Sequence, residues 1–502
     1  MKNLPIYLLF TLLFAVACDN PDVGEDPVEV ASKVTWTLPI TTDSDEARSL
    51  FLAGVHANDM LRFDDANDLF KRSIEIDSTL AIAHLYAATT ASSSNEYRRH
   101  LQHAVSLIQR AAAEEQMLIM AERNGFVSNV EGQLSLCLQL TETQPRSPRA
   151  WLALAAVHTD LNHADASRES FTRAVSLAPD FAGAYMQFGN NYLFVEPRGL
   201  FQAEEFFRTA IELEPDEPNP YDLLGDAYRA HGNLDEAYVA YTQAAERAPE
   251  NGLPLQQRGH VNSFLGNYAE ARDDYSRSIE LELERGNNTA AFFEVYKAYT
   301  NLHAGDPATA ISELKEIADR PYDTLEGSDD IKINALTSIA MIAMHEGDFD
   351  TAEETLDERA ILMRGQSGLS GVEEFVRNQE ANITYFEGIF AAHKKLHAEA
   401  TAKAREYASL VEPDPNPRKL EPMHEIMGMN EYVKGNYQEA VRHLTQGDLT
   451  DAYLKYFRAD ALERAGDTDR ANQLFAELST WNFNDVGFAI IRNDVLSRTG
   501  SL

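Results

Sequence analysis

The sequence predicts an all-α protein built as a solenoid of helical hairpins, and three observations support this fold class. The chain repeats itself with a period of 34 residues between residues 148 and 285, a length typical of stacked two-helix units. A glycine followed five residues later by an alanine recurs through the carboxyl half, as in Gly347 and Ala352. Strand signals are nearly absent. With 502 residues, the chain is also far longer than one ordinary core requires.

The composition is that of a folded protein with a strongly acidic charge balance. Hydrophobic residues make up 44% and charged residues 25% of the chain, well away from the composition of disordered proteins. The 80 acidic residues exceed the 43 lysines and arginines and give a formal net charge of −37. Nucleic-acid binding depends on basic residues that neutralise phosphates, and no basic run occurs, so this function class is set aside. The acidity suits solubility or the attraction of basic partners.

Residues 1–17 are expected to be a secretory signal, because Lys2 precedes an apolar run that is too short for a comfortable membrane span. The run ends in AVAC at residues 15–18, which resembles the lipobox of bacterial lipoproteins, with alanine where leucine is usual. This resemblance implies that Cys18 carries several acyl chains, which together anchor the protein at a membrane. An ordinary signal peptide cut after Ala17, or a short apolar helix, is the alternative.

Residues 18–41 are expected to be a flexible tether between that anchor and the folded body. The stretch is acidic, contains three prolines and lacks helical periodicity. The aspartate after Cys18 resembles the inner-membrane retention signal of some Gram-negative bacteria, but the choice of membrane stays open. The remaining cysteine, Cys137, has no partner for a disulfide and is expected to be a small buried apolar residue.

Residues 42–146 are expected to hold the amino-terminal hairpins. The clearest unit covers residues 47–80 and is marked by Gly54, Ala66 and Phe70. Residues 81–146 show amphipathic helices without a clean repeat signature. They are expected to be degenerate hairpins of the same solenoid.

The clear repeat array covers residues 148–285 in four adjacent units. In the unit at 218–251, small residues such as Gly225 let two antiparallel helices approach closely, and Tyr228 and Tyr241 fill the space beside them. This pattern resembles the signature of the tetratricopeptide repeat (TPR) family. The resemblance implies a right-handed superhelix of helical hairpins.

Residues 286–412 are expected to be weaker hairpins of the same kind, and residues 418–502 to be further hairpins. The glycine and alanine pair marks their turns, at Gly305 and Ala310, Gly347 and Ala352, Gly435 and Ala440, and Gly466 and Ala471. The loop at residues 413–417 is the best internal boundary, because it reads PDPNP. The total is about twelve hairpins, followed by a last helix near Val486–Arg498 that would cap the exposed apolar end.

No motif in the chain predicts catalysis. A GxxxxGK phosphate loop, an HExxH zinc motif and a GxSxG nucleophile elbow are all missing from the sequence. The 14 histidines are scattered, and none stands at metal-ligand spacing with cysteine. The sequence therefore predicts no catalytic residues, no metal and no cofactor, and the protein is expected not to be an enzyme.

The TPR resemblance implies a partner-binding groove, because in this family the first helix of each hairpin lines the concave surface. Polar residues there that do not serve packing are the candidate contacts, and they are Asn190, Asp222, Asp226, Arg229, Gln256 and His260. This acid-leaning mixture favours basic or polar peptide segments. Family members that bind chaperone tails use several basic residues in the groove, whereas Arg229 stands almost alone here, so that role is not expected.

These observations predict a protein-binding scaffold of the bacterial cell envelope, held at a membrane through Cys18, either in the periplasm or exposed at the surface. Partners would be other proteins or peptides, and not nucleic acid. One alternative is a carrier of an extended polymer or peptide, which would need aromatic side chains along the concave face. The other is an unrecognised enzyme, which would need a convergent polar pocket in residues 81–146 or 363–420.

Overall fold

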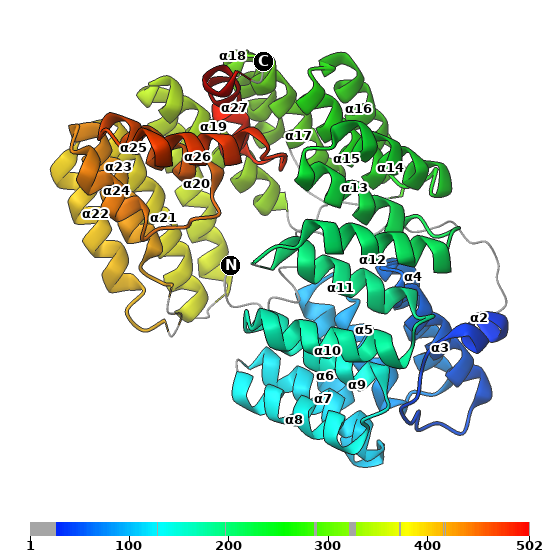
Figure 1. Cartoon of the computed structure of the whole chain (residues 1–502). Coiled ribbons are helices and arrows are strands. Elements are labelled where there is room, and N and C mark those ends of the chain that lie inside the picture. The colour runs from blue at the N-terminus through cyan, green and yellow to red at the C-terminus, as the bar shows by residue number, and fades with distance from the viewer. Residues whose placement is uncertain are drawn as a thin grey trace. The chain divides into compact units, whose positions relative to one another are not determined.

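The structure is a computed structural model that describes residues 27–500, except 128, 196, 286–288, 321–327, 371–372, 415 and 417. Throughout these residues the regular elements are helices (Figure 1). The chain divides into two compact units, the first reaching to Gln257 and the second starting at Arg258. Cys18 and the expected signal sequence lie outside the described residues.

The first unit begins with α2 (Pro27–Lys33) and continues as six helical hairpins. These hairpins are α3 (Asp45–Asp59) with α4 (Phe63–Ile76), α5 (Ala81–Thr89) with α6 (Ser94–Ser106), α7 (Ala113–Phe126) with α8 (Val130–Thr143), α9 (Pro148–Asp160) with α10 (Ala164–Leu177), α11 (Ala182–Phe194) with α12 (Leu200–Leu213), and α13 (Asn219–His231) with α14 (Leu234–Arg247). A short 3-10 helix, η1 (Ile108–Arg110), lies between α6 and α7.

The second unit starts within α15 (Leu253–Leu265), which pairs with α16 (Tyr268–Glu284). The further hairpins are α17 (Thr289–His303) with α18 (Pro307–Asp319), α19 (Ser328–Glu346) with α20 (Phe349–Ser370), α21 (Glu373–His393) with α22 (His397–Leu410), α23 (Glu421–Lys434) with α24 (Tyr437–Leu444), and α25 (Ala452–Arg464) with α26 (Thr468–Ser479). A single helix, α27 (Val486–Thr499), follows them. The expected all-α solenoid of about twelve hairpins is confirmed, and residues 81–146 form α5 with α6 and α7 with α8.

A glycine on the first helix of a hairpin faces a buried aromatic ring on the second. A Cβ atom built on Gly225 would lie 2.6 Å from Cε1 of Tyr241, and the same relation joins Gly54 to Phe70 and Gly189 to Phe207. Real carbon contacts are near 3.5–4.0 Å, so only glycine allows this approach. The close packing that the sequence predicted from Gly225 and Tyr241 is therefore present.

The glycine that precedes each repeat's alanine ends the first helix. Gly232, Gly305 and Gly435 have φ values of 81°, 80° and 84°, which is the left-handed conformation that glycine adopts without strain. In hairpins that lack this glycine, Leu61 and Lys395 occupy the same place with φ of 61° and 63°. The turn geometry is thus a property of the repeat, even where the sequence does not favour it.

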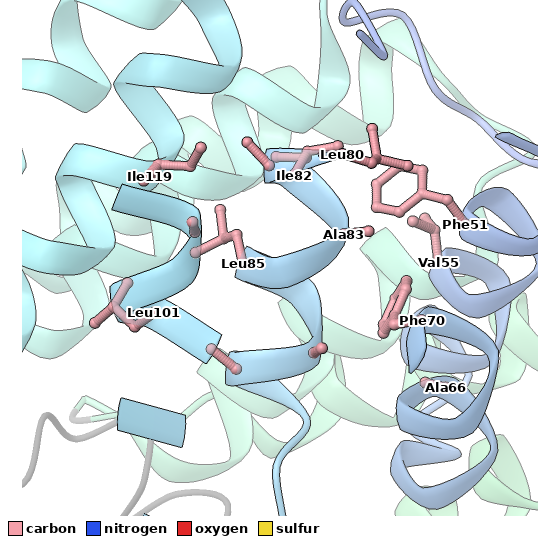
Figure 2. Packing of buried hydrophobic residues seen from close by; sticks show 14 of the residues in the cluster. Phe51, Val55, Ala66, Phe70, Leu80, Ile82, Ala83, Leu85, Leu101 and Ile119 are labelled. Carbon is pink, nitrogen blue, oxygen red and sulfur yellow. The ribbon is translucent and has the colours of Figure 1, made fainter. Parts of the chain in front are cut away.

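The buried core of the first unit starts at the first hairpin. Phe51 of α3 and Phe70 of α4 are both fully buried and pack with Leu80 and Ile82 at the start of the next hairpin (Figure 2). The Tyr86 ring lies 5.4 Å from each of these phenylalanine rings. Aromatic and aliphatic packing therefore joins consecutive hairpins into one layer.

The expected tether at residues 18–41 differs from the structure over its second half. Residues 27–33 form α2, the ring of Trp36 lies 5.3 Å from that of Phe51, and Leu38 is only 5% exposed. Apolar side chains pack on the first unit from every second residue here, because Trp36, Leu38 and Ile40 alternate along an extended segment. This segment is therefore part of the folded body, and the expectation of flexibility is wrong from residue 27 onward.

Candidate functional site

Three of the six candidate groove residues form one buried cluster on α13. Asp222, Asp226 and Arg229 share one helix face and are exposed by only 6%, 2% and 4%. Nη2 of Arg229 lies 2.7 Å from Oδ1 of Asp226, and the hydroxyl of Tyr241 donates to the same oxygen at 2.7 Å. Asp226 and Arg229 both contact Tyr241 and so serve the packing of α13 against α14. The structure thus corrects the expectation that they are free of packing roles.

The α13 cluster contains more negative charge than positive charge. Burial raises the pKa of the Asp222 carboxyl well above its usual value, and the neighbouring Asp226 raises it further. Oδ1 of Asp222 is buried without a hydrogen-bond partner among the described residues, whereas Asp226 accepts from both Arg229 and Tyr241. We therefore expect Asp222 to hold the proton of the pair and Asp226 to be the ionised partner of Arg229.

The other candidates of the first unit are Asn190 and Gln256. Asn190 lies on α11 and is half-buried, and its Oδ1 atom has no hydrogen-bond partner in the described part of the chain. Gln256 lies on α15 and is 4% exposed. Their role in partner binding stays a prediction, as it does for the α13 residues.

His260 is hydrogen-bonded to Asn484, near the carboxyl end of the same chain. This residue of α15 is 4% exposed, and its Nδ1 atom lies 2.8 Å from Nδ2 of Asn484 and 2.6 Å from the hydroxyl of Tyr275. The amide oxygen of Asn484 lies 2.9 Å from Nε2 of His303, which is 1% exposed. The side chain of Asn484 therefore contacts three groups of the second unit at once.

Asn484 belongs to a stretch that we name the 481–499 segment, which comprises residues 481–485 and α27. Nη2 of Arg492 donates to the carbonyl oxygen of Phe264 at 2.5 Å, and Nδ2 of Asn493 donates to that of His303 at 3.2 Å. Phe264 and His303 stand at the ends of α15 and α17, where carbonyl oxygens lack a donor within the helix. The segment thus caps two helices of the second unit.

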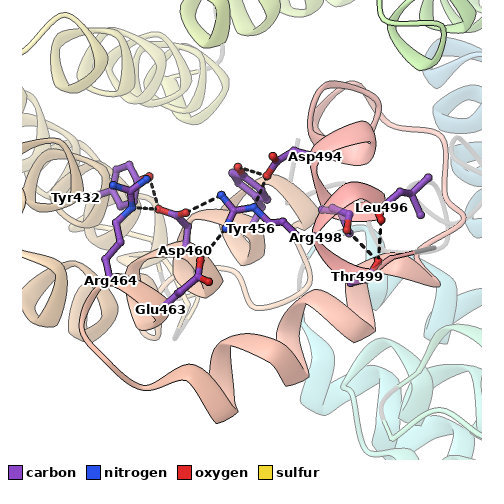
Figure 3. A network of polar contacts seen from close by, with 10 residues as sticks. Tyr432, Tyr456, Asp460, Glu463, Arg464, Asp494, Leu496, Arg498 and Thr499 are labelled. Carbon is purple, nitrogen blue, oxygen red and sulfur yellow. Dashed lines mark hydrogen bonds and ion pairs between the residues drawn. The ribbon is translucent and has the colours of Figure 1, made fainter. Parts of the chain in front are cut away.

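The opposite side of α27 is held by α25 (Figure 3). The guanidinium of Arg498 contacts Asp460 at 3.1 Å and Glu463 at 2.7 Å, both on α25. The hydroxyl of Tyr456 donates to Asp494 at 2.7 Å. The helix was expected to cap the apolar end of the solenoid, but the structure shows that it also contacts α17 and α19, and so joins early and late hairpins of the second unit.

In the first unit, an ion pair joins the end of α3 to the start of α9. The guanidinium of Arg149 on α9 binds both carboxylate oxygens of Asp59, with Nη1 2.6 Å from Oδ1. Both side chains are buried, at 7% and 3% exposure. Burial raises the pKa of the Asp59 carboxyl, and Arg149 opposes that shift. This ion pair fixes the first hairpin against a helix 90 residues further on.

Two further contacts place α3 against α11 and α13. A Cβ atom on Gly183 would lie 2.8 Å from Cβ and 3.0 Å from the carbonyl oxygen of Asp59, so glycine is needed for this approach. Nδ2 of Asn219 donates to the carbonyl oxygen of Met60 at 2.7 Å. The amino-terminal ends of α9, α11 and α13 therefore all contact the end of α3.

Sequence reasoning did not find Asp59, Arg149, Asn484 or Arg492. None of them belongs to the repeat signature, and their partners are 90 to 228 residues away in the chain. One signal was available, because Arg149 and Arg492 are charged residues within otherwise apolar helix faces. Such a charge indicates a buried polar partner, although it does not identify which one.

The described residues contain no group of three or more histidine, cysteine or acidic side chains arranged to hold a metal ion. His84 and His100 of the first unit are joined by a hydrogen bond. Nδ1 of His84 lies 3.2 Å from Nδ1 of His100, whose Nε2 atom faces Arg99. Since arginine can only donate, His100 accepts from it and donates to His84.

No helix in the described part of the chain combines the length and the apolar character that a membrane span requires.

Comparison with known proteins identifies the repeats. The family model described as tetratricopeptide repeat matches residues 148–181, 219–251 and 254–284. The chain therefore contains TPR repeats, and they lie in the array that the sequence pattern singled out.

Curated relatives match over parts of their length. Anaphase-promoting complex subunit 3 of Schizosaccharomyces pombe is 28% identical over 184 residues, which are 36% of this chain and 27% of that protein. Cellulose synthase operon protein C of Xanthomonas axonopodis pv. citri is 25% identical over 263 residues, 51% of this chain and 16% of that protein. The chain spans 22–27% of the length of the first curated relatives that it matches.

Among solved structures, the crystal structure of MamA is 20% identical and covers 33% of this chain and 96% of its own, with a TM-score of 0.30. MamA from Desulfovibrio magneticus RS-1 is 18% identical and covers 35% of this chain and 97% of its own, with a TM-score of 0.31.

Proposed function

We propose that this TPR-containing chain is a non-catalytic scaffold that binds protein partners and is held in the bacterial cell envelope by a lipid anchor on Cys18. The observation that carries the proposal is the series of helical hairpins in each of the two units, several of them with an interlocked glycine and aromatic residue, as at Gly225 and Tyr241. Stacked repeats of this kind present extended surfaces for other macromolecules. TPR-containing relatives such as anaphase-promoting complex subunit 3 are named as subunits of assemblies, which supports a scaffold role.

The acidic balance of the chain supports partners with basic segments. The net charge of −37 raises the encounter rate with positively charged proteins and repels phosphate backbones. Binding that depends on this charge should weaken with salt, because exposed charges are screened beyond about 8 Å at physiological ionic strength.

The anchor is tested by metabolic labelling with a clickable palmitate analogue in the native cells. We expect the wild-type chain to carry the label and the Cys18→Ala variant to lack it, because position 18 is the proposed acylation site. Cys137→Ala is the matched control, since that cysteine is buried and should leave the label unchanged. A wild-type chain without label would contradict the anchor and leave the scaffold role to the next experiment.

The scaffold role is tested by chemical crosslinking in native membranes followed by mass spectrometry. We expect a reproducible set of envelope proteins with wild-type chain and its loss with Cys18→Ala, because the anchor concentrates the protein at the membrane. A co-purifying glycan without protein partners would favour the polymer carrier. Turnover of a small molecule by the purified chain would favour the enzyme.

A further inference from the structure

We propose that the inner face of the second unit, formed by the ends of α15 and α17 and by α25, is a docking site for a helical segment of a protein partner, and that the 481–499 segment is its built-in competitor. The proposal rests on the scaffold role, and it adds the position of the site and the chemistry of its ligand. The evidence is the way in which the chain's own segment is held.

The 481–499 segment combines buried apolar contacts with directed polar contacts of the kind that recognise a ligand. Asn484 is bound by His260, Tyr275 and His303, and the guanidinium of Arg492 is bound by the carbonyl of Phe264. Each of these receiving groups belongs to the regular hairpins. When the segment leaves, the carbonyl at the end of α15 again lacks a donor, and the site again favours a cation, because a helix carboxyl end is partially negative.

The segment is also the part of the second unit that can leave without opening a hairpin. α27 is not half of a hairpin, and residues 480–485 alone join it to α26. Arg492 is 8% exposed and pairs with no carboxylate in the described residues, so its burial costs free energy that the surrounding contacts must offset. A segment whose burial costs free energy can be exchanged for a ligand that binds more favourably.

The geometry defines the ligand that the site takes. It needs a side-chain amide at the position of Asn484, an acidic residue next to it to cap the helix, and an arginine eight residues after the amide. Apolar side chains correspond to Phe488, Ile491 and Val495, each 1% exposed or less. A second arginine, at the position of Arg498, meets Asp460 and Glu463 of α25.

The test uses the full chain and a fluorescein-labelled synthetic peptide with the sequence of residues 480–500, followed by fluorescence anisotropy. The double variant Asn484→Ala, Arg492→Met weakens the internal competitor and leaves the receiving groups intact. We expect it to bind the peptide at least about tenfold more tightly than wild type. A peptide that carries the same two changes should bind neither protein. Arg470→Ala, an exposed residue of α26, is the control and should behave as wild type.

A second measurement covers the case in which the double variant does not fold. In the variant Ala489→Cys, the introduced thiol lies in the buried contact of α27 with α17 and α19. If the segment exchanges, excess unlabelled peptide should accelerate the reaction of this introduced thiol with a thiol reagent, because the peptide traps the open state. An unchanged circular dichroism spectrum with excess peptide should exclude unfolding of the second unit, and buried Cys137, which lies on α8 of the first unit, should stay unreactive.

Labelling of the introduced thiol at a rate independent of peptide concentration, or equal peptide affinity of wild-type and double-variant chains, would overturn the proposal. Peptide binding in the absence of any crosslinked partner would instead uphold the docking site and count against the scaffold role. The two failures are therefore distinguishable.

Discussion

Replacement of Gly225 by alanine tests the interlock between the two helices of a hairpin. The added Cβ would lie 2.6 Å, 2.7 Å and 2.8 Å from Cε1, Cδ1 and Cζ of Tyr241, about 1 Å inside ordinary carbon contact. The Tyr241 ring is fully buried, and its hydroxyl is fixed by Asp226, so it cannot move aside without loss of that hydrogen bond.

Two opposing effects set the size of the change. Overpacking of a tight site costs about 1–3 kcal/mol, and loss of the Tyr241 hydrogen bond adds about 1 kcal/mol. The higher helix propensity of alanine returns about 1 kcal/mol. We therefore expect Gly225→Ala to lower the free energy of unfolding of the first unit by about 1–3 kcal/mol. Gly259→Ala should cost less, because its nearest Tyr275 atoms are 3.0 Å away.

Thermal unfolding followed by circular dichroism, together with hydrogen exchange of α13 and α14, measures this effect. The matched control is Gly365→Ala, because Gly365 lies within α20 and a Cβ there meets nothing within 4 Å. That control should stabilise its helix by about 0.5–1 kcal/mol. A Gly225→Ala protein that is as stable as wild type, with unchanged protection of α13 and α14, would refute the interlock.

Three further predictions follow from buried charges and from the turns. Asp222→Asn should stabilise the first unit by about 1–3 kcal/mol at pH 7. The raised pKa of Asp222 means that its stability contribution is present below pH 3.8 and is lost as the pH rises through the folded pKa. Urea unfolding should therefore show no such gain at about pH 3.5, and an equal gain at both pH values would contradict the assignment of the proton to Asp222. Burial lowers the pKa of His303 to about 4, and Arg492 also opposes its protonation. The free energy of unfolding of the second unit should therefore fall by roughly 3 kcal/mol as the pH falls from about 6.5 to 4. His303→Gln should reduce this loss of stability in urea titrations, and an identical pH profile would rule out the contribution of His303. Lys395→Gly should raise the melting temperature, since a left-handed non-glycine residue costs about 1–2 kcal/mol; a lower melting temperature would show that the side chain contributes more than the strain costs.

The repeat fold could be predicted from sequence because its determinants are local. Gly225 and Tyr241 are 16 residues apart, and Gly232 precedes Ala237 by five, so a short window contains each contact and its turn. The same logic failed at Leu61 and Lys395, where tertiary packing imposes the turn on residues that disfavour it. The packing of the extended segment around Trp36 was not predicted from helical periodicity, because its alternating apolar residues follow a period of two.

The candidate site was predictable only in part. Asp222, Asp226 and Arg229 could be placed on one helix face, because residues three and four apart on a helix are neighbours. Their burial was not predictable, since it depends on Tyr241 of the following helix. The contacts of Asn484 with His260 and of Arg492 with Phe264 span more than 200 residues, and no local pattern encodes such a pairing.

The ion pair between Asp59 and Arg149 has a consequence for the order of folding. In an open repeat array each hairpin can form as soon as its neighbour exists, and nucleation can begin anywhere. Here the first hairpin leaves the ribosome about 90 residues before its arginine is made and about 160 before Asn219 is available to Met60. The formation of contacts of such long range costs loop-closure entropy. The amino-terminal hairpin should therefore stay loosely held during synthesis and become locked only when α13 arrives, which makes the first unit one cooperative body instead of a row of independent repeats.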